Sequence, residues 1–408
     1  MKVTFVHHGA EFGGVERHVI DLITRLEPSK FELVILCFGR YEFRDACFGK
    51  QAGRVKIISG LRRTRFLDYW RGFRETRPDL IVFESGSVGD FPWYGHLAGK
   101  LSSARRAIDF EHGMPPGIPK VRVDGLRGLL RRLGGWRTRH GIGRKLAWRV
   151  SDKIVTVSNA LREALIREYG GPEEKMLTIW NGVDVQYFAS NPQKQPDLRA
   201  SLGIDESESV LLAVARLTPH KRIGMLLEAM EALRKRKNRQ EIRCLIAGAG
   251  PQEEELRQQC KQMGLSGAVL FLGHQNDVRP CYAAADIFVL PSQSEGFSLS
   301  LIEAMASGLA PIATAAGGAV EMISDGRDGW LINSREQLTA AIEYALAHPE
   351  ERRQAGLRAR QKAVEQLSVE ACADKIKGLL LAMSAPSAPA NLGEAGKRTA
   401  GDRGGRAQ

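Results

Sequence analysis

Short apolar segments alternate with amphipathic ones along most of this chain. Residues 3–6 are apolar, a glycine-rich loop follows them, and from about Val15 apolar side chains recur at the spacing of one face of a helix. Segments that are short, β-branched and apolar on both faces are typical of buried parallel strands. The alternation therefore predicts an α/β protein with doubly wound parallel sheets.

The predicted strands form two series, which a polar segment with two prolines, residues 189–196, separates. The first series comprises residues 3–6, 33–37, 55–58, 80–83, 106–110, 154–157 and 177–180. The second comprises residues 210–215, 242–247, 269–272, 287–290, 310–313 and 330–332. We expect two Rossmann-like domains of similar size that face each other across a cleft, where the carboxyl ends of the strands bind ligands.

On this basis we divide the chain into four parts. Residues 1–188 and 189–365 form the N-terminal and C-terminal Rossmann-like domains, and residues 366–383 form a last helix that packs back on the N-terminal domain. Residues 384–408 have too little apolar content to form a core, so we expect a disordered tail there.

The composition excludes several classes of protein. Of the 408 residues, 43% are hydrophobic and 26% are charged, as in ordinary globular proteins. Apolar runs are far shorter than the roughly 20 residues that cross a bilayer. The N-terminus lacks the pattern of a secretion signal, so we expect a cytoplasmic protein. The six cysteines show no CxxC pair and no metal-ligand spacing with histidine, so we expect no metal site.

The excess of basic residues lies mainly in one segment. The formal net charge is +12 at pH 7, and residues 120–149 contain ten basic residues and one acid. Leucines and tryptophans are interleaved with these charges, which is the mixture expected of a segment that lies on an anionic membrane surface. A mobile loop with solvated charges is the alternative.

The stretch 291–311 carries the strongest chemical pattern. A strand ends at its start, a loop with Glu295 and Gly296 follows, and a helix begins at about Ser298 and carries Glu303. The free N–H groups and the positive end of such a helix attract phosphate. Phosphate repels carboxylates, so the two glutamates would accept hydrogen bonds from sugar hydroxyls. Alternatively, Glu295 is a helix-capping acid and Glu303 is solvated.

Further candidates follow other predicted strands. Arg216 and Lys221 lie in the loop after residues 210–215, where two fixed cations would suit a diphosphate. Two exposed basic residues in a loop are the alternative. In the N-terminal half, the loop with Gly13 and Gly14 would let a phosphate approach the backbone, although it does not match the dinucleotide fingerprint.

His112 is a further candidate, because it follows the predicted strand 106–110 and so lies at its carboxyl end. A single histidine in such a place is more often a structural hydrogen-bonding group than a catalyst. These motifs acquire a more specific meaning together, because in combination they resemble those of a known family.

That family is the retaining family 4 glycosyltransferases of GT-B architecture, which the chain resembles from residue 1 to about residue 380. The resemblance rests on the elements GGVERHV, EHG, NGVD, ARLTPHK, LIAGAGP, FLGH, SEGFSLSLIEAMASG and GGAVEMISDGRDGWLI, in this order and at about the family's spacing. The two glutamates separated by seven residues, with the upstream Arg-(four residues)-Lys pair, are specific in combination. Arg222 and Ser298 stand where the family more often has glycine.

The resemblance implies roles for the candidates of the C-terminal half. Arg216 and Lys221 would hold the diphosphate of a nucleotide-sugar donor, Glu303 would bind the ribose, and Glu295 would meet hydroxyls of the transferred sugar. The backbone of Gly296, Phe297 and Ser298 would lie near phosphate and sugar. The C-terminal domain would therefore bind the donor.

The N-terminal domain would bind the acceptor. The resemblance implies that the Gly13–Gly14 loop closes on the diphosphate and that His112 contacts the sugar near the reacting carbon. The expected activity is retaining transfer of a sugar to a hydroxyl of a glycan or lipid-linked acceptor, in lipopolysaccharide or other cell-surface polysaccharide synthesis. No cofactor is implied, and we expect no metal, because no Asp-x-Asp element follows a strand.

Two other functions remain open at this point. An epimerase or phosphorylase of the same fold would use a nucleotide sugar without a second sugar as acceptor. A non-catalytic polyanion-binding protein would rely on the basic segment 120–149, although no nucleic-acid-binding motif accompanies it, so we expect no nucleic acid partner.

Overall fold

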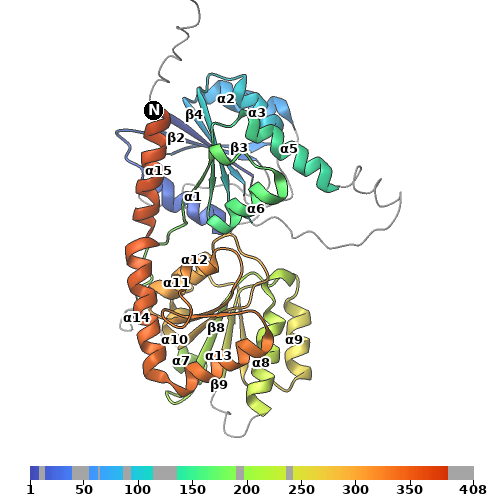
Figure 1. Cartoon of the computed structure of the whole chain (residues 1–408), viewed down its shortest axis with the longest axis vertical. Helices are drawn as coiled ribbons and strands as arrows, with labels where there is room; N and C mark the ends of the chain where they lie inside the picture. The colour runs from blue at the N-terminus through green and yellow to red at the C-terminus, as the bar shows by residue number, and fades with distance from the viewer. Residues whose placement is uncertain are drawn as a thin grey trace, which may run out of the picture.

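The computed structural model describes residues 1–8, 14–38, 55–62, 65–85, 93–113, 136–189, 197–235 and 242–384. These residues form two domains that lie one above the other along the longest axis of the molecule (Figure 1). Gly13, residues 120–135 of the basic segment and the tail beyond residue 384 lie outside the described part. Each domain is built on one parallel sheet with helices around it, which confirms the predicted architecture.

The N-terminal domain contains a seven-stranded sheet in the order β3-β2-β1-β4-β5-β6-β7. Its strands are β1 (Lys2–His7), β2 (Glu32–Phe38), β3 (Val55–Leu61), β4 (Leu80–Ser85), β5 (Arg106–Glu111), β6 (Lys153–Thr156) and β7 (Met176–Thr178). Its helices are α1 (Gly14–Arg25), α2 (Phe66–Thr76), α3 (Trp93–Lys100), α5 (Trp136–Val150) and α6 (Asn159–Tyr169), with the 3₁₀ turn η2 (Glu173–Lys175). All its strand pairs are parallel, so the carboxyl ends of the strands meet at one edge.

The C-terminal domain contains a six-stranded sheet in the order β10-β9-β8-β11-β12-β13. Its strands are β8 (Ser209–Val214), β9 (Ile242–Ala247), β10 (Val269–Gly273), β11 (Ile287–Leu290), β12 (Ala310–Thr314) and β13 (Trp330–Ile332). Its helices are α7 (Leu198–Ser201), α8 (Ile223–Lys235), α9 (Glu253–Gln262), α10 (Arg279–Ala284), α11 (Leu299–Ala306), α12 (Ala319–Met322), α13 (Arg335–Ala347) and α14 (Pro349–Gln366), with the 3₁₀ turn η4 (Pro219–Lys221).

Each sheet has an apolar cluster on both of its faces. Because successive side chains of a strand point to opposite sides, each strand contributes to both clusters. In β1, Phe5 belongs to the apolar cluster under α1, whereas its neighbour Val6 belongs to the cluster under α2 and α3. In β8, Leu211 and Leu212 divide between two clusters in the same way. This two-sided burial explains why the strands contain almost only apolar residues.

The domains are joined by direct contacts as well as by the chain. Glu321 of α12 accepts hydrogen bonds from the backbone N–H groups of Asn159 and Ala160 at the start of α6, at 3.0 and 2.8 Å. It also accepts a hydrogen bond from the indole of Trp180 at 2.8 Å. A carboxylate from one domain thus satisfies the positive end of a helix in the other.

The last helix, α15 (Val369–Ser384), returns to the N-terminal domain and runs beside α1 (Figure 1). Ile376 and Leu380 are fully buried in the cluster that contains Val19 and Leu22 of α1. Of the helices in the described part of the chain, none has the length and apolar character of a membrane span.

Candidate functional site

The carboxyl ends of β8 and β11 bring two predicted site residues together. Lys221 lies in η4, directly after the loop that follows β8, and Glu295 lies in the loop after β11. The Lys221 Nζ and Glu295 Oε1 atoms are 2.6 Å apart, and the two side chains are only 18% and 11% exposed. The backbone N–H of Gln293 donates to the carbonyl of His220 at 2.7 Å, which ties the two loops to each other. Lys221 is therefore held in place before any ligand binds.

Arg216 lies in the same loop, and its side chain is exposed. Arg222, directly after Lys221, has φ +52° and ψ +37°, a left-handed conformation that glycine adopts without strain. A glycine would adopt this conformation more easily, so η4 ends at Arg222 at a small conformational cost.

Helix α11 presents its N-terminus at the same edge. Ser298 is the N-cap residue, and its hydroxyl accepts a hydrogen bond from the backbone N–H of Leu301. Gly296 packs so closely on the N-terminal domain that an added Cβ would lie 2.1 Å from the carbonyl oxygen of His112. Phe297, in turn, stacks on Trp180 of the N-terminal domain. The loop 295–298 therefore lies at the domain boundary, with the predicted site residues of both domains around it.

Glu303, one turn into α11, is 5% exposed, so the alternative of a solvated side chain is wrong. The hydroxyl of Tyr282 donates to Glu303 Oε2 at 2.8 Å. Across the domain boundary, Arg17 Nη1 of α1 lies 3.8 Å from Glu303 Oε1. Burial raises the pKa of Glu303, and Arg17 and the Tyr282 hydrogen bond offset part of this rise.

The N-terminal domain presents buried histidines and acids at its facing edge. His112, after β5, places its Nε2 atom 2.6 Å from Glu84 Oε2 at the end of β4. The ring of His18 from α1 lies 5.4 Å from that of His112, centroid to centroid. Burial, and secondarily His112, lowers the pKa of His18 to about 3. Gly14 is the first residue of α1, at the same edge.

Sequence reasoning missed three residues that complete this arrangement, namely Arg17, Glu84 and Tyr282. Glu84 could have been found, because a charged residue directly follows the apolar strand residues 80–83. Arg17 and Tyr282 could not, because each was identified only by its contact with Glu303, which is distant in the sequence. No cluster of three or more histidine, cysteine or acidic side chains that could hold a metal occurs among the residues described.

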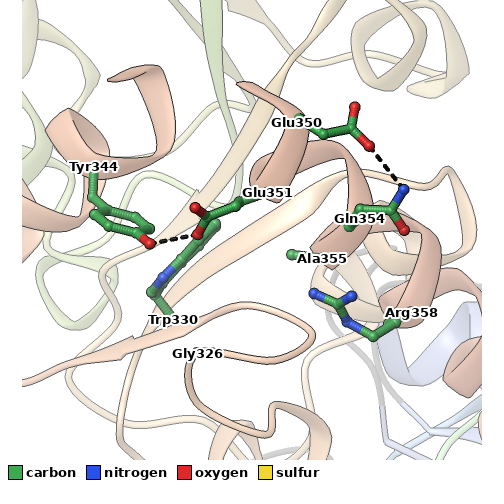
Figure 2. Close-up of a pocket in the computed structure, with 8 residues that line it drawn as sticks. All are labelled: Gly326, Trp330, Tyr344, Glu350, Glu351, Gln354, Ala355 and Arg358. Carbon is green, nitrogen blue, oxygen red and sulfur yellow. Dashed lines mark hydrogen bonds between the residues drawn. The ribbon is translucent and has the colours of Figure 1, made fainter. Parts of the chain in front are cut away.

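A pocket of about 460 Å³ lies elsewhere, between β13 and the first turns of α14 (Figure 2). Its lining residues are Gly326, Trp330, Tyr344, Glu350, Glu351, Gln354, Ala355 and Arg358. Several of its polar groups bond to one another, as Tyr344 does to Glu351 and Gln354 to Glu350. It includes none of the predicted site residues, so we do not assign the site to it.

Comparison with known proteins adds the family. The model of the family "Glycosyltransferase Family 4" matches residues 12–187, and that of "Glycosyl transferases group 1" matches residues 194–362. A D-inositol 3-phosphate glycosyltransferase 2 from Catenulispora acidiphila is 30% identical over 348 residues, which are 78% of this chain and 78% of that protein. The chain belongs to the family 4 glycosyltransferases.

Other relatives of this family 4 chain match over a shorter length. An uncharacterized glycosyltransferase from Methanocaldococcus jannaschii is 34% identical over 177 residues, 42% of this chain. The match spans only 45% of that protein, or about half its length.

Among solved structures, HepE from Anabaena in complex with UDP-glucose superposes with a TM-score of 0.77, covering 94% of this chain and 100% of that chain at 21% identity. This likeness shows that the two proteins share the GT-B fold.

Proposed function

We propose that the protein transfers a sugar from a nucleotide-diphosphate sugar to an acceptor hydroxyl, with retention of the anomeric configuration. The observation that carries this proposal is the Lys221–Glu295 pair beside the N-terminus of α11, at the domain boundary. A fixed cation and the backbone N–H groups of a helix N-terminus at one place suit a diphosphate. Family membership supports the same activity, and UDP-glucose is bound in the Anabaena structure of the same fold.

In the proposed reaction, the bond between the sugar and the diphosphate loosens first. Negative charge then grows on the leaving oxygens while the sugar becomes oxocarbenium-like, and the acceptor hydroxyl enters from the same face. Lys221, Arg216 and the N–H groups of residues 296–298 would stabilise this charge more strongly in the transition state than in the bound donor. These cations would supply the neutralisation that a metal ion supplies in other enzymes, so we propose a metal-independent reaction.

The remaining residues would position the donor. Glu295, which Lys221 holds in place, would accept hydrogen bonds from hydroxyls of the transferred sugar. Glu303, which Tyr282 orients, would accept them from the ribose. Gly14, and with it the preceding glycine, would let α1 close on the diphosphate. His112 would contact the sugar near the reacting carbon.

We propose a glycan or a lipid-linked molecule as acceptor, in lipopolysaccharide or other cell-surface polysaccharide synthesis. The basic segment 120–149 supports this proposal, and so does one exposed face of α3 that continues to the residue directly after the helix. Trp93, Leu97 and Leu101 are 42%, 39% and 63% exposed at helical spacing, with Lys100 exposed among them. Apolar side chains among basic ones are typical of a surface that lies on anionic lipid.

A thermal-shift panel with UDP, GDP, ADP and TDP tests donor binding. A ligand at about 100 times its dissociation constant stabilises a protein by about 2.7 kcal/mol, which one base of the panel should produce in the parent. Lys221→Ala should lose most of that shift. If no nucleotide shifts the parent, the proposal fails. Analysis of the product formed from a labelled donor then separates transfer from epimerase or phosphorylase activity, and its anomeric configuration tests retention.

Flotation with liposomes tests the membrane part of the proposal. The parent should float with anionic liposomes at low salt, and less at high salt, because the attraction is screened. Leu101→Ser should weaken flotation. Leu357→Ser on α14, where the side chain is 47% exposed, is the matched control and should not weaken it. Equal recovery of the protein with neutral and anionic liposomes would contradict the proposed binding to anionic membranes.

A further inference from the structure

The facing edge of the N-terminal domain contains a buried acid that the proposed reaction does not use. Glu84 and His112 are 0% and 4% exposed at the side chain, and Glu84 Oε2 lies 2.6 Å from His112 Nε2. The second oxygen of Glu84 has no hydrogen-bond partner among the described residues. The hydrogen-bonding capacity of this carboxylate is therefore directed at one ring nitrogen.

We propose that Glu84 is a positioning residue for His112. Its carboxylate keeps the proton of the imidazole ring on Nε2. The Nδ1 atom then has a free lone pair and is the ring atom that meets the transferred sugar. This inference rests on the proposed function for the role of His112. The physical basis is general: the hydrogen bond made by one ring nitrogen of a histidine decides which nitrogen carries the proton. A carboxylate only accepts, so the nitrogen that faces it must donate.

Three other titratable groups near His112 or Glu84 do not compete for this role. Glu111, the preceding residue, accepts hydrogen bonds from Arg144 and Trp148 of α5 at 3.0 and 3.1 Å. His18 from α1 stays neutral, because burial lowers its pKa to about 3. Cys372 from α15 stays a neutral thiol, because burial raises its pKa to about 12. In the described part of the chain, the hydrogen bond of the His112 ring to Glu84 is thus the one that orients it.

The arrangement has a chemical consequence for the sugar. A ring nitrogen with a free lone pair accepts a hydrogen bond from a sugar hydroxyl, and the carboxylate behind the ring makes that nitrogen a stronger acceptor. The hydroxyl oxygen then becomes richer in electrons. An electron-rich hydroxyl stabilises the positive charge that grows on the sugar ring, so Glu84 would act on the transition state more than on donor binding.

The structure also provides a matched control. His96 Nε2 lies 2.6 Å from Asp109 Oδ1, and these side chains are 1% and 0% exposed. This second buried pair joins α3 to β5, and the other Asp109 oxygen accepts from the hydroxyl of Ser151 at 2.5 Å. It is thus a buried pair of the same kind, whose hydrogen bonds join residues of the N-terminal domain.

The direct test is the nitrogen NMR spectrum of the parent, ¹⁵N-labelled at histidine, at pH 7.5. His112→Gln assigns the signals by removing one set. The chemical shifts should report a protonated Nε2 and an unprotonated Nδ1 for His112. A proton on Nδ1 would overturn the inference. Because this measurement needs no sugar transfer, its result is independent of whether the proposed function holds.

Kinetics give the second test. Glu84→Gln should lower kcat about 10- to 100-fold and change KM for the donor less than about threefold, as for other residues that act through an orienting hydrogen bond. Glu84→Asp, which keeps the carboxylate, should recover part of kcat. Asp109→Asn should lower thermal stability and leave kcat within about threefold. Equal kcat values for Glu84→Gln and Asp109→Asn would overturn the inference, and absence of transfer by the parent would instead overturn the proposed function.

Discussion

The loops of the C-terminal edge and the strand ends of the N-terminal edge differ in how far they expose their charged side chains. The edge of the C-terminal domain places a cation, Lys221, partly in solvent and fixes it with Glu295. The edge of the N-terminal domain buries its ionisable groups, with Glu84 and His112 in one pair and Glu111 and Arg144 in another. Under the proposed function, the first edge would meet the charged diphosphate, and the second would hold uncharged groups of the sugar.

Under the proposed function, this difference would suit the two edges to different parts of the substrates. A diphosphate brings two or more negative charges and needs exposed, preorganised cations. A sugar ring and an acceptor hydroxyl bring none, and for these groups oriented hydrogen bonds in a low-dielectric site are more effective. The four predictions below test the two edges and the contact between them.

The largest expected effect is on the C-terminal edge. Lys221→Ala should raise the barrier of sugar transfer by roughly 2–4 kcal/mol, a rate loss of about 30- to 1000-fold. The control is Lys235→Ala, since Lys235 also pairs with a glutamate, Glu231 at 2.7 Å, but on an exposed helix surface. In initial-rate measurements, the rate of sugar transfer by this control should be close to that of the parent. Similar rates for the two variants would contradict the assignment of Lys221.

The contact between the edges should be almost as sensitive. Gly296→Ala places a Cβ against the carbonyl of His112, so the loop 295–298 must move away from the N-terminal domain. A displacement of about 1 Å at a catalytic site costs about 100-fold in rate. Gly267→Ala meets no atom within 4 Å and should leave kcat/KM unchanged. A Gly296→Ala enzyme that is as fast as the control would show that the close approach is not needed.

The N-terminal edge should lose stability in acid. In the unfolded chain, His18 takes up a proton as the pH falls below its ordinary pKa of 6.5. In the folded chain, its pKa is about 3, so His18 stays neutral down to that pH. The parent should therefore lose about 2 kcal/mol through this residue between pH 7 and pH 5. Urea unfolding at both pH values measures it, and His18→Gln should lack this part of the loss. If the stabilities of the parent and of His18→Gln changed equally between pH 7 and pH 5, His18 would be protonated in the folded state as readily as in the unfolded chain.

At the C-terminal edge, stability should depend on pH with the opposite sign, and the change in stability should be smaller. The pKa of Glu303 is raised by burial, so its contribution to stability is complete below pH 4.5 and is lost as the pH rises through the raised value. The Tm of Glu303→Gln should therefore gain on that of the parent between pH 4.5 and pH 8. Arg17 and Tyr282 limit the gain. A gap between the two Tm values that stays constant with pH would show that burial does not penalise this carboxylate.

The sequence predicted the sheets and much of the C-terminal edge because both depend on local patterns. Buried strands must be apolar on both faces, and Lys221, Glu295 and Ser298 belong to short segments next to such strands. Contacts between distant segments left no local pattern. Arg17 meets Glu303 only because the domains pack against each other, and the buried pair of Glu84 and His112 needs β4 and β5 to be neighbours.

The chain passes between the domains twice, and the two crossings are bonded to each other. Val183 donates its N–H to the carbonyl of Leu367 at 3.0 Å, and Val369 donates to the carbonyl of Val183 at 2.8 Å. An added Cβ on Gly182 would lie 2.3 Å from the carbonyl oxygen of Ser368. Because these bonds join the two crossings, any relative motion of the domains would have to bend both crossings together.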